Sequence, residues 1–124
     1  MKLLLDTHVF LWWRADDPRL SAGPRRAISR AAEVFVSVAS AWEIAIKISL
    51  GQLRIPGPVE EAVLDSRFSP LPISFAHAAG VATLPFHHRD PFDRILIAQA
   101  QAEQLTLVSA DRKLEPYGVP VMWI

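Results

Sequence analysis

The chain has 124 residues, of which 51% are hydrophobic and 21% charged, with 13 acidic and 13 basic side chains. This length fits one domain over residues 1–124, and the composition excludes a disordered chain. The balanced charge excludes a strongly basic nucleic-acid-binding domain, and the absence of cysteine excludes disulfides and thiolate metal sites. We expect a cytoplasmic protein, because neither a signal peptide nor a membrane-spanning apolar stretch is apparent.

Hydrophobic periodicity and punctuation by proline and glycine divide the chain into alternating strands and helices. In chain order the pattern predicts a strand at residues 1–5, helices at 7–16 and 21–32, a strand at 33–38, helices at 41–50 and 59–68, a strand at 71–73, helices at 74–83 and from 91 onward, a strand at 105–109, a helical turn at 111–115 and a strand at 119–123. Ser74 and Asp90 are expected N-caps. Pro70 and Pro72 confine the strand beside them to a sheet edge.

Strands separated by helices predict an α/β fold with a mostly parallel central sheet of about five strands, flanked by helices and joined by right-handed crossovers. Ligands of such sheets bind at the carboxyl ends of the strands. Asp6 directly follows the first strand, and Asp111 follows the strand at 105–109 by two residues. We therefore expect both acids at this edge, although either can instead serve only as the N-cap of the next helix.

Two further acids occur in helices. Asp93 is three residues after the expected cap Asp90, where the helix dipole alone would favour an acid. Glu43 lies in an apolar stretch, where an unpaired carboxylate would be costly. An i to i+4 salt bridge with Lys47 is one way to satisfy Glu43, and a metal ion or a catalytic neighbour is the other.

Four blocks of sequence resemble the PIN-domain ribonucleases, and in particular the VapC-like toxins of type II toxin–antitoxin pairs. The blocks are LLLDTHVFLWW, SVASAWEIAIKISLGQL, HHRDPFDRILIAQA and LVSAD, which lie in the family's order and span nearly the whole chain. The resemblance implies a PIN-like fold and a metal-dependent endoribonuclease that leaves a 5′-phosphate and a 3′-hydroxyl.

The resemblance also assigns residues and partners. The metal-binding and catalytic acids would be Asp6, Glu43, Asp93 and Asp111, supported by Thr7, by Ser109, and by Ser40 or Ser37. Carboxylates suit Mg²⁺ or Mn²⁺ and, without cysteine, do not suggest zinc. The implied partners are RNA, a cognate antitoxin that wraps the first helices, and a second copy of the chain in a homodimer or in a toxin–antitoxin hetero-oligomer.

Basic and aromatic side chains near the acids are candidates for RNA contacts. The basic candidates are Arg14, Lys47, Arg94, Arg112 and Lys113. Each of them can instead belong to a solvated helix face. We favour Arg94, as a partner for phosphate or for a nearby carboxylate. We leave the histidines His8, His87 and His88 out of the metal set. Packing in the core or in an interface is a better explanation than base stacking for Trp12, Trp13 and Trp42.

Two other functions remain compatible with the sequence. A phosphatase with an aspartyl nucleophile also begins with an apolar strand that ends in Asp, but it needs a second Asp two residues on, where this chain has His8. A non-catalytic binding module of the same fold is the other alternative, against which the complete set of four acids argues.

Overall fold

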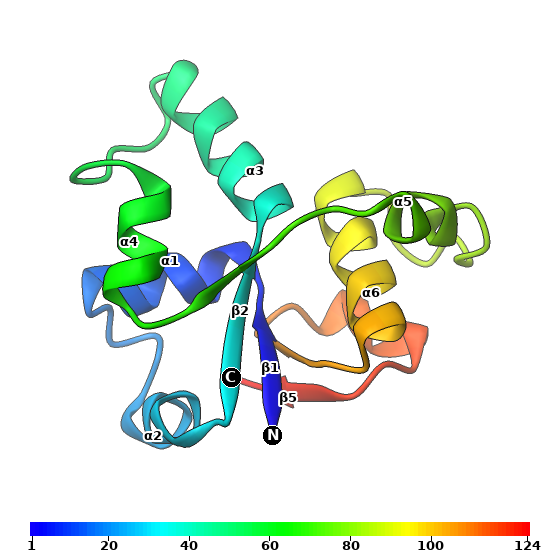
Figure 1. Ribbon diagram of the computed structural model, residues 1–124, viewed down its shortest axis with the longest axis horizontal. Helices are drawn as coiled ribbons and strands as arrows, with labels where there is room; N and C mark the ends of the chain where they lie inside the picture. Colours follow the sequence, from blue (N-terminus) through cyan, green and yellow to red (C-terminus); the bar gives the residue numbers. More distant parts are fainter.

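The computed structural model describes residues 1–124, and it forms a parallel sheet of five strands with helices on both faces (Figure 1). The strands follow the order β3-β2-β1-β4-β5, and every neighbouring pair is parallel. The elements are β1 (Lys2–Leu5), α1 (Thr7–Ala15), α2 (Ala22–Arg30), β2 (Glu33–Ser37), α3 (Val38–Ser49), α4 (Val59–Asp65), β3 (Ser69–Leu71), α5 (Phe75–Val81), α6 (Pro91–Glu103), β4 (Thr106–Ser109), the 3₁₀ helix η1 (Arg112–Tyr117) and β5 (Val121–Trp123). The predicted α/β class is confirmed, and the sheet is entirely parallel.

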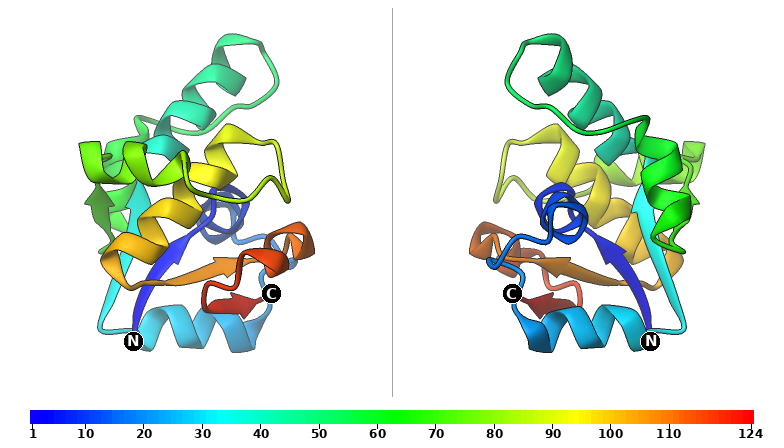
Figure 2. Two further views of the ribbon diagram at one scale, coloured as in Figure 1. Left: turned by 90° about the vertical axis from the view of Figure 1, so that its right-hand side faces the viewer. Right: turned by 90° about the vertical axis from the view of Figure 1, so that its left-hand side faces the viewer.

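The central strand β1 divides the hydrophobic core in two. Leu3 and Leu5 face one cluster, to which α1 to α4 contribute, and Leu4 faces the other, to which α6 and η1 contribute. Figure 2 shows these faces in turn, with α5 and α6 in front in the left view. All three leucines are fully buried, and each burial is worth about 1.5–3 kcal/mol. Burial on both faces explains why β1 lacks polar alternation.

Most differences from the predicted boundaries come from the ends of elements. Helix α3 begins at Val38, three residues before the predicted start, because the Ala39 N–H donates to the Ser37 hydroxyl and the strand turns directly into the helix. The third strand ends at Leu71 instead of beginning there, and it includes Pro70. Its place at the edge of the sheet is as predicted, and an edge tolerates a residue that lacks an N–H.

The other short strand shows how proline limits pairing. Strand β5 begins at Val121, because Pro120 has no N–H to donate, yet the Pro120 carbonyl accepts a hydrogen bond from the Leu107 N–H at 2.9 Å.

Helix α5 contributes few residues to the core and packs against α6, as Figure 1 shows. None of the helices has both the length and the apolar character needed to cross a membrane.

Candidate functional site

Asp6 lies at the carboxyl edge of the sheet, where β1 passes into α1. Its backbone N–H donates to the Val108 carbonyl of the neighbouring strand β4 at 3.0 Å. Its carboxylate Oδ1 accepts a hydrogen bond from the Val9 N–H at 2.8 Å, so the side chain does cap the helix. An acid that served only as a helix cap could remain exposed to solvent, whereas only 5% of Asp6 is exposed.

The buried position affects the ionisation of Asp6. Burial is the main factor that raises the pKa of this carboxyl, and the negative charge of Asp111 acts in the same direction. Hydrogen bonds with the Ser109 side chain and the Val9 N–H oppose this rise in pKa only in part. The influence of the Asp111 charge on Asp6 indicates that these two predicted acids lie near each other.

Glu43 reaches the same region from α3 through Thr7, the residue that follows Asp6. The Thr7 hydroxyl donates to Glu43 Oε1 at 2.7 Å and lies 2.9 Å from the Ser40 hydroxyl. Thr7 and Ser40 are almost completely buried. Glu43 Oε2 also lies 3.6 Å from Lys47 Nζ, so the salt-bridge alternative is present together with the contact to Thr7. Ser40 is thus the serine beside Glu43, whereas Ser37 caps α3.

Asp93 occupies the first turn of α6, which Asp90 caps as predicted by accepting from the N–H groups of Phe92 and Asp93. Burial is the largest cause that raises the pKa of Asp93 to about 6, and the nearby charges of Asp90 and Asp6 act in the same sense. Asp93 also lies close to Asp111, since His88 Nε2 is 2.8 Å from Asp93 Oδ2 and 3.9 Å from Asp111 Oδ2.

Asp111 is the most exposed member of the set, with 41% of its side chain accessible. It caps η1 by accepting from the Lys113 N–H at 3.0 Å, and its own N–H donates to the Ser109 hydroxyl at 3.0 Å. Ser109 is fully buried. These two hydrogen bonds fix the turn after β4. They place Asp111 at the same edge of the sheet as Asp6.

His88, which the sequence analysis left out of the metal set, lies among these acids. Its Nε2 is 2.8 Å from Asp93 Oδ2 and 3.9 Å from Asp111 Oδ2. His88, Asp90 and Asp93 also each offer a ligand atom within 4.8 Å of the others, as a metal ion would require. The exclusion of His88 from the metal-binding residues stays a prediction, but the sequence analysis did not foresee its position beside Asp93 and Asp111. Only its place in the block that contains Asp90 and Asp93 could have drawn attention to it.

Arg94 does not point toward the acids or toward solvent, contrary to the prediction that it contacts phosphate or a carboxylate. Only 6% of the residue is exposed. Its guanidinium donates to the backbone carbonyls of Val81 at 3.2 Å, Leu84 at 3.3 Å and Pro85 at 2.8 Å. The arginine binds the segment between α5 and α6, and this structural function explains why it is buried.

The other cations and the tryptophans have varied environments. Arg14 donates to the Ser66 hydroxyl at 3.2 Å, and Arg112 lies over the ring of Trp123. Trp12 and Trp13 are partly buried against the core, in agreement with the structural interpretation. Trp42 is 60% exposed, and its ring lies 5.1 Å from that of Phe92. Trp42 is thus the tryptophan with a free surface near the acids.

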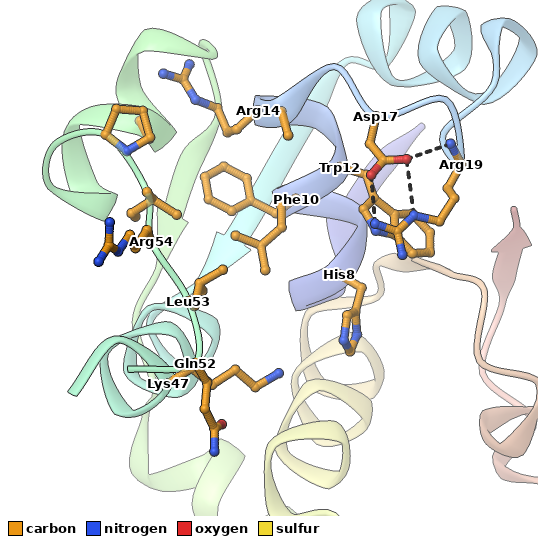
Figure 3. A pocket seen from close by; sticks show the side chains of 15 residues that line it. His8, Phe10, Trp12, Arg14, Asp17, Arg19, Lys47, Gln52, Leu53 and Arg54 are labelled. Atoms are coloured by element: carbon orange, nitrogen blue, oxygen red, sulfur yellow. Dashed lines mark hydrogen bonds and ion pairs between the residues drawn. The ribbon is translucent and has the colours of Figure 1, made fainter. Parts of the chain in front are cut away.

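A cavity of about 390 Å³ lies between α1 and the segment that follows α3 (Figure 3). One of its lining residues, Lys47, pairs with the candidate acid Glu43, and His8 lines it as well. Phe10, Leu53 and other apolar side chains line it together with several cations. Its lining therefore combines apolar side chains with predominantly basic ones.

The donor set at the sheet edge fits a hard divalent cation. It consists of carboxylate oxygens with one imidazole nearby, which is the chemistry that Mg²⁺ and Mn²⁺ accept. No lysine or arginine forms an ion pair with Asp6, Asp93 or Asp111. Burial is the main cause of the raised pKa values of Asp6 and Asp93, and repulsion from neighbouring acids acts in the same direction. A cation bound there would compensate the negative charge.

A parallel α/β sheet that gathers four acids at its carboxyl edge defines a class of protein, and the comparisons identify it. The family model of the PIN domain matches residues 3–119, so the chain belongs to the PIN-domain family.

Among relatives, it is 32% identical over 121 residues to Ribonuclease VapC22 of Mycobacterium tuberculosis (strain ATCC 25618 / H37Rv), covering 95% of this chain and 93% of that protein. The resemblance to VapC-like proteins is therefore confirmed.

Solved structures share this fold at low sequence identity. VapBC2 from Rickettsia felis, bound to a DNA fragment from its promoter, gives a TM-score of 0.73 at 15% identity and covers 98% of each chain. DNA-bound VapBC from Salmonella typhimurium gives a TM-score of 0.70 at 17% identity, over 98% of this chain and 97% of that one. At such identities the match establishes the fold alone.

Proposed function

We propose that the protein is the toxin of a type II toxin–antitoxin pair and acts in the cytoplasm as a metal-dependent endoribonuclease. The observation that carries this proposal is the gathering of Asp6, Glu43, Asp93 and Asp111 at one sheet edge of a PIN domain, with His88 between two of them. The relative VapC22, whose name describes a ribonuclease, supports the choice of RNA as substrate.

The four acids would hold Mg²⁺ or Mn²⁺. When bound, such an ion supplies activation of water and compensation of the charge that develops on the phosphate. Thr7 holds the Glu43 carboxylate in place because its hydroxyl donates to it, and the Ser40 hydroxyl lies 2.9 Å from that of Thr7. Ser109 supports Asp6 and the turn of Asp111. Burial raises the pKa of Asp93 to about 6 in the metal-free chain, and a bound cation would favour its ionised form. Cleavage would leave a 5′-phosphate and a 3′-hydroxyl.

The cavity beside α1 is the surface that we assign to the antitoxin. Its apolar and basic lining residues suit a peptide segment that carries apolar and acidic side chains. Several structural relatives are complexes of a VapC with its VapB, or a toxin–antitoxin complex from Klebsiella pneumoniae, which supports such a partner. Substitution Arg54→Glu in this lining should weaken binding of the antitoxin without changing RNA cleavage.

We also propose a homodimer. Large apolar side chains are exposed on α3 and at the start of α5, where Val38 is 45%, Trp42 60% and Phe75 96% accessible. Such exposure is the usual sign of a contact surface. Sedimentation analysis of the wild type and of Trp42→Ser would test the assignment, since the variant should shift toward the monomer.

Cleavage of RNA tests the enzymatic proposal directly. The purified chain should cut a cellular RNA pool with Mg²⁺ or Mn²⁺, should lose activity in EDTA, and should be inactive as Asp6→Asn. A wild type that cuts no RNA with either metal would contradict the proposal and leave a non-catalytic binding module. Metal-dependent release of phosphate from small esters, in the absence of RNA cleavage, would instead indicate a phosphatase.

A further inference from the structure

The segment between α5 and α6 holds a functional side chain although it contains little regular structure. Residues 85–90 lie outside any helix or strand, so backbone ladders cannot fix them. Arg94 from the following helix binds the carbonyls on the α5 side of the segment. A loop that is fixed by a buried guanidinium can present a side chain with little freedom.

Tyr117, at the end of η1, fixes the other side of the segment through a single hydroxyl. This hydroxyl accepts hydrogen bonds from the His88 N–H at 2.9 Å and from the Arg94 guanidinium at 3.1 Å, and it donates to the His88 carbonyl at 3.3 Å. Tyr117 is 8% exposed. The backbone of His88 is therefore held at both its N–H and its carbonyl by one buried group that Arg94 itself supports.

The imidazole of His88 faces the acids. Its Nε2 lies 2.8 Å from Asp93 Oδ2, and only 18% of the His88 side chain is exposed. A hydrogen bond from an immobile imidazole fixes the orientation of a carboxylate, and such outer-shell contacts to metal-binding residues are worth about 10–100-fold in metal affinity or activity. The same nitrogen is 3.9 Å from Asp111 Oδ2, so it stands between acids that come from two different elements.

We propose that His88 is a positioning residue that orients the Asp93 carboxylate toward the cation, and that Arg94 and Tyr117 hold His88 in that position. This inference rests on the proposed function, because it assumes that Asp93 binds the metal. It assigns a purpose to Arg94 that differs from phosphate binding: the arginine acts on the site through Tyr117 and His88, without contact with substrate.

Two substitutions of similar size test the inference. His88→Leu removes the N–H donor, whereas His88→Gln retains a side-chain N–H. The matched control is His87→Leu, which removes the neighbouring imidazole: that ring also packs on Tyr117 but forms no ion pair with the acids. The measurements are the dissociation constant for Mn²⁺, from electron paramagnetic resonance of the protein without RNA, and kcat and KM for an RNA oligonucleotide. His88→Leu should weaken Mn²⁺ binding and lower kcat by about tenfold each, with KM unchanged.

The conservative variants then separate positioning from packing. His88→Gln should recover most of the Mn²⁺ affinity and kcat, Tyr117→Phe should lower both by a smaller factor than His88→Leu, and His87→Leu should match the wild type. Because Gln and Leu fill similar space, a difference between them at position 88 reflects the N–H and not packing, even where both variants lose thermal stability.

Three results would overturn the inference. Values for His88→Leu within twofold of the wild type, in a wild type that binds Mn²⁺ and cuts RNA, would refute the positioning role and leave the proposed function intact. A nitrogen coupled directly to bound Mn²⁺ in the wild type but absent from His88→Leu would make His88 a ligand instead. A wild type that neither binds Mn²⁺ nor cuts RNA would overturn the proposed function together with this inference.

Discussion

The two halves of the acid cluster are built in different ways. The β1/α3 half consists of Asp6 and Thr7, where β1 passes into α1, and of Ser40 and Glu43 in α3, both of which the buried Thr7 hydroxyl contacts. The α6 half consists of His88, Asp93 and Asp111 with the buried Arg94 and Tyr117 behind them. In the first half the sheet itself sets the positions. In the second half, Asp111 also follows a strand, but side-chain contacts from Tyr117 and Arg94, and not backbone pairing, hold the segment that carries His88.

The largest expected effect is on stability in the α6 half. Arg94→Met should lower the free energy of unfolding by about 4 kcal/mol, because buried carbonyls lose their donor and Tyr117 loses a partner. Urea denaturation of the metal-free protein measures this quantity. The matched control is Arg89→Met, since Arg89 is exposed. Equal stabilities of the two variants would show that the segment before α6 needs no such support.

The next effect is on activity in the β1/α3 half. Asp6→Asn should reduce RNA cleavage by at least roughly 100-fold, which corresponds to about 2.7 kcal/mol. Asn also caps helices, so α1 should persist, and removal of a buried charge should leave the free energy of unfolding unchanged or higher. Initial cleavage rates and circular dichroism test the two statements. Unimpaired cleavage would remove Asp6 from the catalytic set.

A smaller effect concerns the dependence of stability on pH. The pKa of Asp93 is about 6 in the folded chain, against about 3.9 in an unfolded one. The folded state thus binds the proton more tightly, and this contribution to stability is complete below about pH 4 and is lost as the pH rises through 6.

The free energy of unfolding of the metal-free protein should therefore fall by up to about 2 kcal/mol more between these pH values than that of Asp93→Asn. Chemical denaturation across this range measures the difference, and saturating Mn²⁺ should reduce it. If the free energies of unfolding of the wild type and of Asp93→Asn changed equally with pH, the pKa of Asp93 would be ordinary.

The smallest expected effect distinguishes the two contacts of Glu43. Lys47→Ala should change the free energy of unfolding by no more than about 0.5 kcal/mol, since the pair is 3.6 Å apart and its lysine is 32% exposed. Thr7→Val should cost about 1.5 kcal/mol, because it removes a buried hydroxyl that donates to a carboxylate. A larger loss for Lys47→Ala would mean that the salt bridge, and not Thr7, fixes Glu43.

The contrast between the halves also explains what the sequence predicts well. An apolar run that stops at an acid indicates both a buried strand and the place of its end, so Asp6 and Asp111 could be assigned to one edge of the sheet from local pattern alone. Asp90 followed by proline indicates the start of α6 in the same way, and with it the place of Asp93 in the first turn.

Contacts between distant residues lie beyond such patterns. Arg94 stands beside Asp93 in sequence, but on a helix adjacent residues point in different directions, and the arginine turns inward to carbonyls 9 to 13 residues earlier. Tyr117 approaches His88 from 29 residues away. Neither contact leaves a periodic signal, which is why the support of the α6 half was missed and Arg94 was assigned to phosphate.

The direct passage from β2 into α3 limits which changes in chain length the protein can accept. Ser37 is the last residue of the strand and also the N-cap of the helix, so no loop separates the two elements. One residue inserted at this junction would rotate the helix by about 100° relative to the sheet and turn Glu43 away from Thr7. Residues 57 and 58, just before α4, lie outside helices and strands and are exposed, so insertions and deletions among homologues can be absorbed there. Length variation within the family should therefore be frequent after α3 and absent before it.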